Sequence, residues 1–355
     1  MDTLAQYIQT LSPQLSAWRR DFHHFAESGW VEFRTAAKVA ETLDSLGYEL
    51  AMGRDVVDAE SRMGLPDAAT LAQEFARARA QGAPEKWLAP FEGGFTGIVA
   101  TLNTGRPGPT LAFRVDMDAL DLSEALDEGH RPFRDGFASC NAGMMHACAH
   151  DGHTAIGLGL AQVLKQNGAQ LNGTIKLIFQ PAEEGGAGAR AMIEDGLFER
   201  FPVEAVFGLH NWPGIPVGQM MAMPGPVMAG TCAFEIIVRG HGCHAAMPHQ
   251  GIDAIVTGAQ LVQALQTVVS RTLHPCESAV VSVTQFHAGE AWNIIPEEVV
   301  LRGTIRTFKP EIQEAVERAI ERLCSGIAAA NGAQINVHFD HRYPPTVNSP
   351  AEAKF

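Results

Sequence analysis

The order of apolar patterns changes once along this chain, near residue 228, and that change limits the folds it can form. Before it, short apolar runs typical of buried strands, such as TIKLIFQ and EAVFGLH, alternate with segments of helical periodicity. Strands that alternate with helices favour a mostly parallel sheet covered on both faces, the α/β class. After it, the segments follow the order strand, helix, strand, strand, helix, strand, which is the βαββαβ order of a ferredoxin-like unit.

We therefore predict two domains in the 355-residue chain, which is longer than one hydrophobic core usually serves. The first is an α/β domain with a mixed, mostly parallel sheet, formed by residues 1–228 and by the return of the chain at 341–355. The second is the ferredoxin-like unit, residues 229–340, inserted into the first. Residues 52–93 mix a helical stretch with Pro and Gly, and their pattern indicates no purpose.

Charge and composition exclude several classes of partner. The chain has 26 basic and 40 acidic residues, and no cluster of Lys or Arg is longer than a pair, so we expect no nucleic acid partner. No apolar stretch is long enough to span a membrane, and the N-terminus lacks the basic start and apolar run of a secretory signal. The six cysteines have no paired spacing and are typical of thiols in a reducing cytoplasm. We expect a cytoplasmic protein that binds no membrane.

One segment, HACAHDGH at residues 146–153, concentrates three His, one Cys and one Asp. Cys and His are the usual ligands of zinc, and the segment lies where a loop leads into a predicted helix, a place where α/β proteins carry their sites. The alternative is a polar cluster that caps the helix through Asp151. The density of ligand-type side chains favours a metal site.

Two adjacent carboxylates, Glu183 and Glu184, follow the buried strand TIKLIFQ. At a strand end they repel each other and lose hydration, so a nearby cation would stabilise them. A metal bound by one would free the other to act as general base on a water molecule. Alternatively, both are acids at a helix N-terminus, where the helix dipole favours them. His210 follows a further strand, so three strand ends offer ligand-type side chains.

Six segments together resemble successive signatures of one enzyme family. They are RVDMDAL, MMHACAHDGHTA, IFQPAEEGGAGARAMIEDGLFE, VFGLHNWPG, GHGCHAAMPH and WNIIPEEVVLRGTIRTF. The family is that of the zinc amidohydrolases that include hippurate hydrolase, plant auxin-conjugate hydrolases and p-aminobenzoyl-glutamate hydrolase, relatives of aminoacylase and glutamate carboxypeptidases. The resemblance implies hydrolysis of the amide bond of a small N-acyl or N-aroyl amino acid, with hippurate-like and p-aminobenzoyl-glutamate-like compounds as candidate substrates.

The resemblance also implies a ligand set. Cys148, His150, Glu184 and His210 would bind two divalent ions, and Glu183 would be the general base. Zinc is the expected metal because thiolate is a soft ligand, and manganese or cobalt could substitute at the other positions.

Four further residues take roles by the same resemblance. His244, from a partner subunit, and Asn293 would stabilise the tetrahedral oxyanion, Arg306 would hold the substrate carboxylate, and Asp116 would orient a metal ligand. Their ordinary alternatives are a loop histidine for His244, a turn cap for Asn293 and a solvated strand residue for Arg306. Residues 229–340 would thus be a lid and dimerisation domain of a homodimer, or of a heteromer with a related subunit.

Two features depart from the family pattern. Ala149 stands where the family has Gly, and its methyl group would be strained if the backbone there is left-handed. Family members also continue beyond the segment YPPTVN to a last His ligand, whereas this sequence stops at Phe355, and the spacing of His341 does not suit a substitute. The resemblance therefore predicts that the sequence as given is a poor hydrolase with exposed strand edges.

Two other functions compete with hydrolysis. One is a metal-binding but catalytically impaired subunit that functions through association of its lid domain, which the intact Glu183 opposes. The other is a thiol enzyme that uses Cys148, which is disfavoured because no second Cys lies nearby in the sequence.

Overall fold

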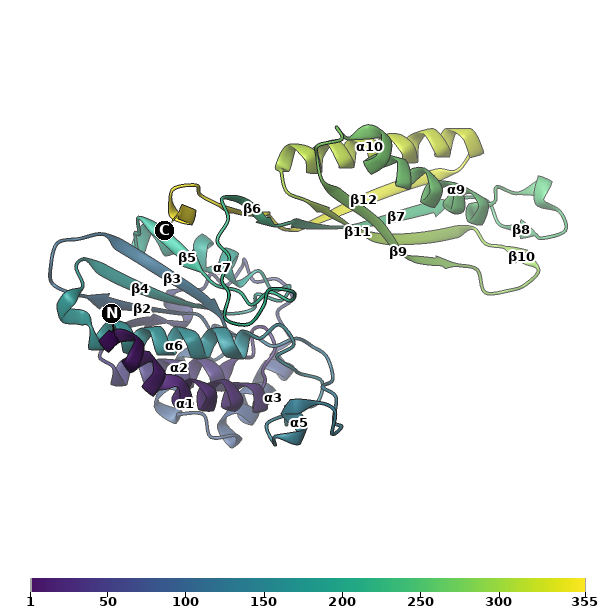
Figure 1. The fold of residues 1–355 in the computed structure, drawn as a ribbon. Helices are drawn as coiled ribbons and strands as arrows, with labels where there is room; N and C mark the ends of the chain where they lie inside the picture. The colour runs from purple at the N-terminus through teal and green to yellow at the C-terminus, as the bar shows by residue number, and fades with distance from the viewer. Residues whose placement is uncertain (1, 355) are drawn as a thin grey trace. The chain divides into compact units, whose positions relative to one another are not determined.

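The computed structural model describes residues 2–354 in two compact units, one ending at Val217 and the other beginning at Gly218 (Figure 1). The helices of the first unit are α1 (Asp2–His24), α2 (Phe33–Ser45), α3 (Ala68–Ala80), α4 (Glu85–Leu88), α5 (Arg131–Arg134), α6 (His150–Gln166), α7 (Gly188–Glu194) and α8 (Leu197–Arg200). Its strands are β1 (Glu49–Met52), β2 (Ile98–Asn103), β3 (Thr110–Asp116), β4 (Thr174–Gln180) and β5 (Ala205–Gly208).

These five strands form one mixed sheet in the order β1-β2-β4-β3-β5. β3 pairs in parallel with β4 and β5, whereas the β1–β2 and β2–β4 pairs are antiparallel. The α/β prediction is confirmed, but "mostly parallel" is wrong for this unit. Because a short turn joins β2 to β3, the two strands run in opposite directions. β4 then lies between them, so it must be antiparallel to one of them.

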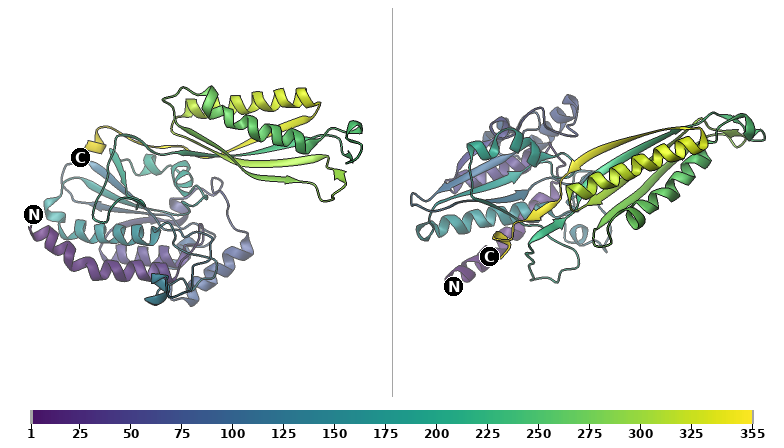
Figure 2. Two further views of the ribbon diagram at one scale, coloured as in Figure 1. Left: turned by 45° about the vertical axis from the view of Figure 1, so that its right-hand side comes forward. Right: turned by 90° about the horizontal axis from the view of Figure 1, so that it is seen from above.

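Helices cover both faces of this sheet, as the alternation of elements predicted (Figure 2). On β4, Leu177 and Phe179 point into the core that α1, α2 and α6 cover, whereas Ile178 points to the opposite core with Ala191 and Met192 of α7. This two-residue alternation of a strand that is buried on both sides explains why TIKLIFQ is a continuous apolar run.

The strands of the second unit are β6 (Gly225–Met228), β7 (Gly230–Arg239), β8 (Cys243–His244), β9 (Ala279–Ala288), β10 (Ile294–Ile295), β11 (Glu298–Thr307), β12 (Gln334–Tyr343) and β13 (Thr346–Asn348). Its helices are α9 (Ala254–Thr267) and α10 (Pro310–Asn331). The antiparallel sheet β12-β7-β11-β9 carries the predicted βαββαβ order, and α9 and α10 share a core with it. Its role as a lid stays a prediction.

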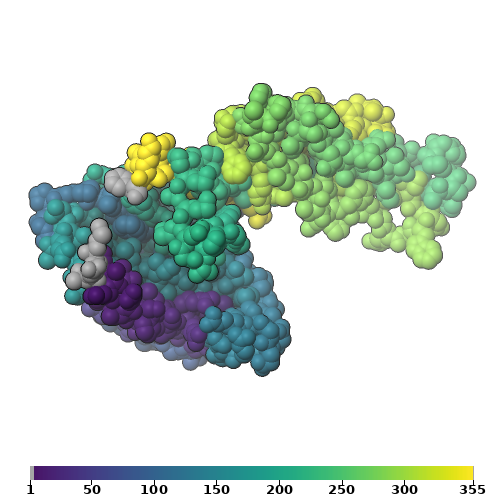
Figure 3. Space-filling model, in the orientation of Figure 1, coloured from purple at the N-terminus to yellow at the C-terminus, as the bar shows by residue number. Residues whose placement is uncertain are grey.

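The chain divides into its two compact units between Val217 and Gly218, and the domain boundary at residue 228 stays a prediction. β6 pairs with β13, so the ribbon that these two strands form belongs to the second unit together with the segment 341–355. The assignment of 341–355 to the catalytic domain stays a prediction. The segment between β5 and β6 lies on the surface (Figure 3). Its residues Trp212 and Met220 have exposed side chains. Among the described residues, none of the helices has both the length and the apolar composition that crossing a membrane requires.

The close approach of α6 to the sheet depends on Gly157. A β-carbon at this position would lie 2.9 Å from Cγ2 of Val115 and 3.0 Å from Cε1 of Phe179. We expect Gly157→Ala to destabilise the first unit, because overpacking costs about 1–3 kcal/mol and exceeds the roughly 1 kcal/mol that Ala gains over Gly in a helix. Denaturant unfolding measures the change.

The matched control is Gly152→Ala in the same helix. Among the described residues, no heavy atom outside the immediate helix backbone would lie within 4 Å of its β-carbon. This variant should lose no stability, and an equal loss in both variants would contradict the packing argument.

Candidate metal centre

The ends of three strands bring the candidate ligands together. β3, β4 and β5 are parallel, so their carboxyl ends meet at one edge of the sheet, where α/β proteins place their sites. The loop after β4 carries the two adjacent glutamates, the loop after β5 carries the histidine, and the first turn of α6 lies beside them. The candidate ligand atoms at this edge that come within 4.8 Å of one another in groups of three belong to Asp116, Cys148, His150, His153, Glu183, Glu184 and His210. One further group, Cys232, Glu317 and His341, lies in the second unit.

Two buried atoms at this edge lack a hydrogen-bond partner within the described chain: Nε2 of His150 and Oε1 of Glu184, 3.8 Å apart. Zinc binds nitrogen and carboxylate oxygen at about 2.0–2.2 Å, so two such ligands of one ion lie at most about 4 Å apart. Sγ of Cys148 lies 3.5 Å from Nε2 of His210, the separation expected for tetrahedral ligands at about 2.3 Å and 2.0 Å. The donor set fits divalent metal.

Asp118, a residue that was not predicted from the sequence, forms contacts with two of the candidate ligands, His150 and Glu184. One carboxylate oxygen lies 3.3 Å from Nδ1 of His150, and the other accepts a hydrogen bond of 2.8 Å from the backbone N–H of Glu184. His150 can therefore present only Nε2 to an ion. The sequence did contain a pattern that indicates Asp118. In RVDMDAL two acids lie at the end of a strand, as Glu183 and Glu184 do after TIKLIFQ.

The centre is strongly anionic. Nε2 of His150 has carboxylate oxygens of Asp116, Glu183 and Glu184 at 3.8–3.9 Å. Burial alone would lower the pKa of His150, but hydrogen bonding to Asp118 and Cys148 and the neighbouring negative charges raise it to about 11. Burial, then the charges of Glu184 and Asp118, raise the pKa of Glu183 to about 7. Such an excess of negative charge favours a bound cation.

Asp116 does not contact His150 as closely as it contacts His153. Its Oδ1 lies 2.7 Å from Nδ1 of His153, and its Oδ2 accepts a 2.6 Å hydrogen bond from Arg114. Burial opposes but does not cancel the effect of these partners, which lower the pKa of Asp116. The predicted role of Asp116, orienting a ligand, stays a prediction.

Glu32 fixes the loop that carries Glu183 and Glu184 through a hydrogen bond to the backbone of that loop. This fully buried carboxylate accepts hydrogen bonds from the backbone N–H of Ala182, at 2.7 Å, and from the hydroxyl of Thr96, at 2.6 Å. Burial, then the charge of Asp118, raise the pKa of Glu32 to about 8. Ala182 itself is left-handed, with φ of +47°. No pattern in the sequence pointed to Glu32.

The remaining predicted residues lie in the second unit. The structure brings His244 and Asn293 together: β8 pairs with β10, and the N–H of Ala245 donates to the carbonyl of Asn293 at 3.0 Å. Arg306 lies near the C-terminal end of β11. Its guanidinium donates hydrogen bonds to the hydroxyl of Thr304 and to the carbonyl of Ile305. The roles of His244, Asn293 and Arg306 stay predictions.

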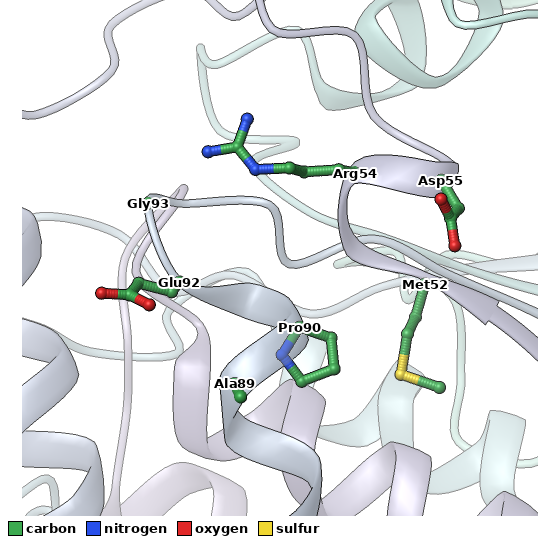
Figure 4. Close-up of a pocket in the computed structure, with 7 residues that line it drawn as sticks. All are labelled: Met52, Arg54, Asp55, Ala89, Pro90, Glu92 and Gly93. Atoms are coloured by element: carbon green, nitrogen blue, oxygen red, sulfur yellow. The ribbon is translucent and has the colours of Figure 1, made fainter.

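A pocket of about 480 Å³ in the first unit is not this centre (Figure 4). None of the candidate ligands lines it. The residues around it are Met52, Arg54, Asp55, Ala89, Pro90, Glu92 and Gly93, at the ends of the segment whose purpose the sequence did not indicate.

Comparison with known proteins identifies the family of this chain. Residues 112–355 match the model of Peptidase family M20/M25/M40. The chain belongs to this family. It is 53% identical over 338 residues to the indole-3-acetyl-aspartic acid hydrolase of Enterobacter agglomerans, a match that covers 95% of this chain and 76% of that protein.

Two further proteins extend the comparison. A p-aminobenzoyl-glutamate hydrolase subunit of Escherichia coli (strain K12) is 52% identical over 336 residues, covering 94% of this chain and 76% of that protein. The YXEP protein of Bacillus subtilis, a dinuclear metal binding peptidase from the M20 family, superimposes with a TM-score of 0.73 at 32% identity, covering 98% of this M20 chain and 78% of that structure. The predicted family and the predicted class of enzyme, a hydrolase of amide bonds, are confirmed. The hypothesis of an impaired, non-catalytic role gains no support from relatives named as hydrolases.

The strain expected at Ala149 is present, since its φ is +65° immediately before α6. We predict that Ala149→Gly stabilises the metal-free protein by about 0.5–1 kcal/mol. The left-handed conformation costs about 1–2 kcal/mol with a β-carbon, and the greater chain entropy of Gly in the unfolded state offsets about 0.5–1 kcal/mol of that gain. Denaturant unfolding in the presence of a chelator measures the change.

Ala147→Gly is the control, because Ala147 lies in the same loop and is not left-handed. It should be neutral or destabilising. Equal effects of the two substitutions would show that the backbone at Ala149 is not strained.

Proposed function

We propose that this chain hydrolyses the amide bond of an N-acyl or N-aroyl amino acid, using two divalent ions held by Cys148, His150, Glu184 and His210. The observation that carries the proposal is the pair of orphaned buried atoms on His150 and Glu184, next to Cys148 and His210 at the same strand edge. A relative of the same family and fold is described as dinuclear. Zinc is the first candidate because of the thiolate ligand, with manganese or cobalt as alternatives.

The relatives suggest the substrate class. Their names specify conjugates of aspartate and of glutamate with an aromatic acyl group. We propose a small substrate of that kind, with p-aminobenzoyl-glutamate and indole-3-acetyl-aspartate as first choices and hippurate as a smaller test compound. Arg306 is proposed to bind the carboxylate of the amino acid part, because a guanidinium pairs with a carboxylate through two hydrogen bonds.

The residues at the strand edge divide the chemistry among them. Bound divalent ions would supply Lewis acidity, which polarises an amide carbonyl and lowers the pKa of water. Glu183 lies next to the ligand Glu184 and 3.9 Å from Nε2 of His150, so it can take a proton from the attacking water and deliver it to the leaving nitrogen. His244 and Asn293 are proposed to donate hydrogen bonds to the oxygen that becomes negative in the transition state.

The assembly and location follow from the same proposal. The second unit would act as a lid and dimerisation domain, giving a homodimer or a heteromer with a related chain, since the Escherichia coli relative is named as one subunit of its hydrolase. All six cysteines are free thiols, which suits the proposed cytoplasmic location.

Replacing each glutamate by Gln tests the division of roles. Glu183→Gln removes a proton acceptor but no ligand, so bound zinc should be unchanged while hydrolysis of p-aminobenzoyl-glutamate or indole-3-acetyl-aspartate falls by about 10²–10⁴. Glu184→Gln removes a ligand and should lower bound zinc. Metal content and turnover are measured on the same samples.

Cys148→Ala and His150→Ala are the controls for metal binding, and both should lose zinc while the chain remains folded, because its cores do not depend on the ion. Exchanged phenotypes for Glu183 and Glu184 would exchange their roles. Unchanged zinc in both control variants would refute the ligand set.

Mixing subunits tests the predicted role of His244. If it acts in the site of a partner subunit, His244→Ala and Glu183→Gln are each inactive, but mixed dimers contain one site with both residues intact and should recover partial activity. Turnover of mixed, refolded subunits is compared with each variant alone. Absence of recovery in demonstrably mixed dimers would mean that His244 acts within its own chain or has no catalytic role.

A further inference from the structure

His153 uses both of its ring nitrogens in hydrogen bonds. Nε2 accepts a hydrogen bond of 3.1 Å from the backbone N–H of Asn211. A peptide N–H can only donate, so Nε2 carries the lone pair and Nδ1 carries the proton. Nδ1 then donates to Oδ1 of Asp116 over 2.7 Å. The tautomer of this buried histidine is therefore fixed by its two neighbours.

The peptide of Asn211 connects His153 to the candidate ligand His210. Its N–H is held by His153, and its carbonyl accepts a 2.6 Å hydrogen bond from Nδ1 of His210. His210 therefore carries a proton on Nδ1, and its Nε2 lies 3.5 Å from Sγ of Cys148. The rings of His153 and His210 also meet edge to face, with centroids 4.8 Å apart.

The other end of this chain of hydrogen bonds is anchored in the sheet. Asp116, the last residue of β3, accepts from Arg114, whose Nε donates to Oε1 of Gln180 at the end of β4 over 2.7 Å. Asp116 and His153 are both buried, whereas Asn211 is exposed. The connection thus runs from the end of a strand in the sheet to an exposed loop.

His153 is not itself suited to bind an ion. It belongs to a group of possible ligands with Asp116 and His150, but both of its nitrogens are already engaged. Ligation through either nitrogen would break a hydrogen bond in a buried site, and the freed N–H of Asn211 or carboxylate of Asp116 would lose its partner.

We propose that His153 is a positioning residue for His210, acting through the peptide of Asn211. It fixes the place and the tautomer in which His210 presents Nε2 beside Cys148. The proposal rests on the proposed function only in taking His210 as a metal ligand, since the hydrogen bonds are present in the chain itself.

Three substitutions of His153 separate this role from simple packing. His153→Gln places an amide oxygen near the position of Nε2 and can still accept from Asn211. His153→Asn retains a donor for Asp116 but is too short to reach Asn211, and His153→Phe keeps a ring without either hydrogen bond. Asn211→Ala is the control, because it removes the side chain and leaves the peptide.

The first measurement is metal affinity of the full chain, by competition with a chelator for zinc. Partners that orient a metal-bound histidine change affinity by about 10–100-fold. We expect a loss of that size for one of the two ions in His153→Phe and His153→Asn, and affinity within about threefold of the parent in His153→Gln and Asn211→Ala. Thermal unfolding of each metal-free variant shows that it is folded.

The second measurement needs no metal. Nitrogen-15 spectra of labelled imidazoles in the metal-free chain should show a proton on Nδ1 of both His153 and His210. His153→Phe should mix the two tautomers of His210, and His153→Gln should not.

These outcomes distinguish the two proposals. If His210→Ala leaves zinc binding unchanged, the ligand set fails, and the tautomer measurement still tests the link from His153 to His210. If His210→Ala loses an ion while His153→Phe binds both ions as the parent does, the role of His153 is refuted. Equal losses in His153→Gln and His153→Phe would also overturn it, because they would show that the acceptor for Asn211 is not what matters.

Discussion

Negative charge gathered at one edge of the sheet is the constraint on which the rest of this structure depends. The parallel strands β3, β4 and β5 end together, and the carboxylates of Asp116, Asp118, Glu183 and Glu184 surround His150 there. Burying one charge without a partner costs several kcal/mol, so this edge is stable only if cations or a dense set of donors meet the charges. The chain supplies hydrogen-bond donors to the carboxylates of Asp116 and Asp118, whereas Oε1 of Glu184 has no hydrogen-bond partner among the described residues.

The difference between side chains that have hydrogen-bond partners and side chains that lack them explains how much of the site could be predicted from the sequence. Cys148, His150, Glu183, Glu184 and His210 are recognisable because ligand-type residues follow buried strands or begin a helix, and their meeting follows from the parallel strand order. The sequence does not say which of several histidines keeps a free nitrogen. His150 and His153 lie three residues apart and are both buried, yet one nitrogen of His150 is orphaned while both nitrogens of His153 are engaged. Only the partners that folding brings from β3 and from the loop after β5 decide this.

About as much of the fold as of the candidate site could be predicted from the sequence. Helices on both sheet faces and the βαββαβ unit follow from local periodicity, which the chain displays clearly. The directions of the strands were harder to predict from the sequence, because they depend on where β4 inserts into the sheet. A short turn between β2 and β3 indicates opposite directions but not whether the two strands are neighbours, and here β4 separates them.

Backbone strain at this edge is the final consequence of the same constraint. Ala149 and Ala182 are both left-handed without being glycine, and each immediately precedes a candidate ligand or base. Such residues persist only where their surroundings determine them. At Ala182 the buried side chain of Glu32 accepts the backbone N–H, and at Ala149 the backbone carbonyl accepts the N–H groups of Gly152 and His153 in the first turn of α6. Hydrogen bonds within the chain therefore hold both strained conformations, and the one at Ala149 lies between Cys148 and His150, so it also sets how these two side chains face one site.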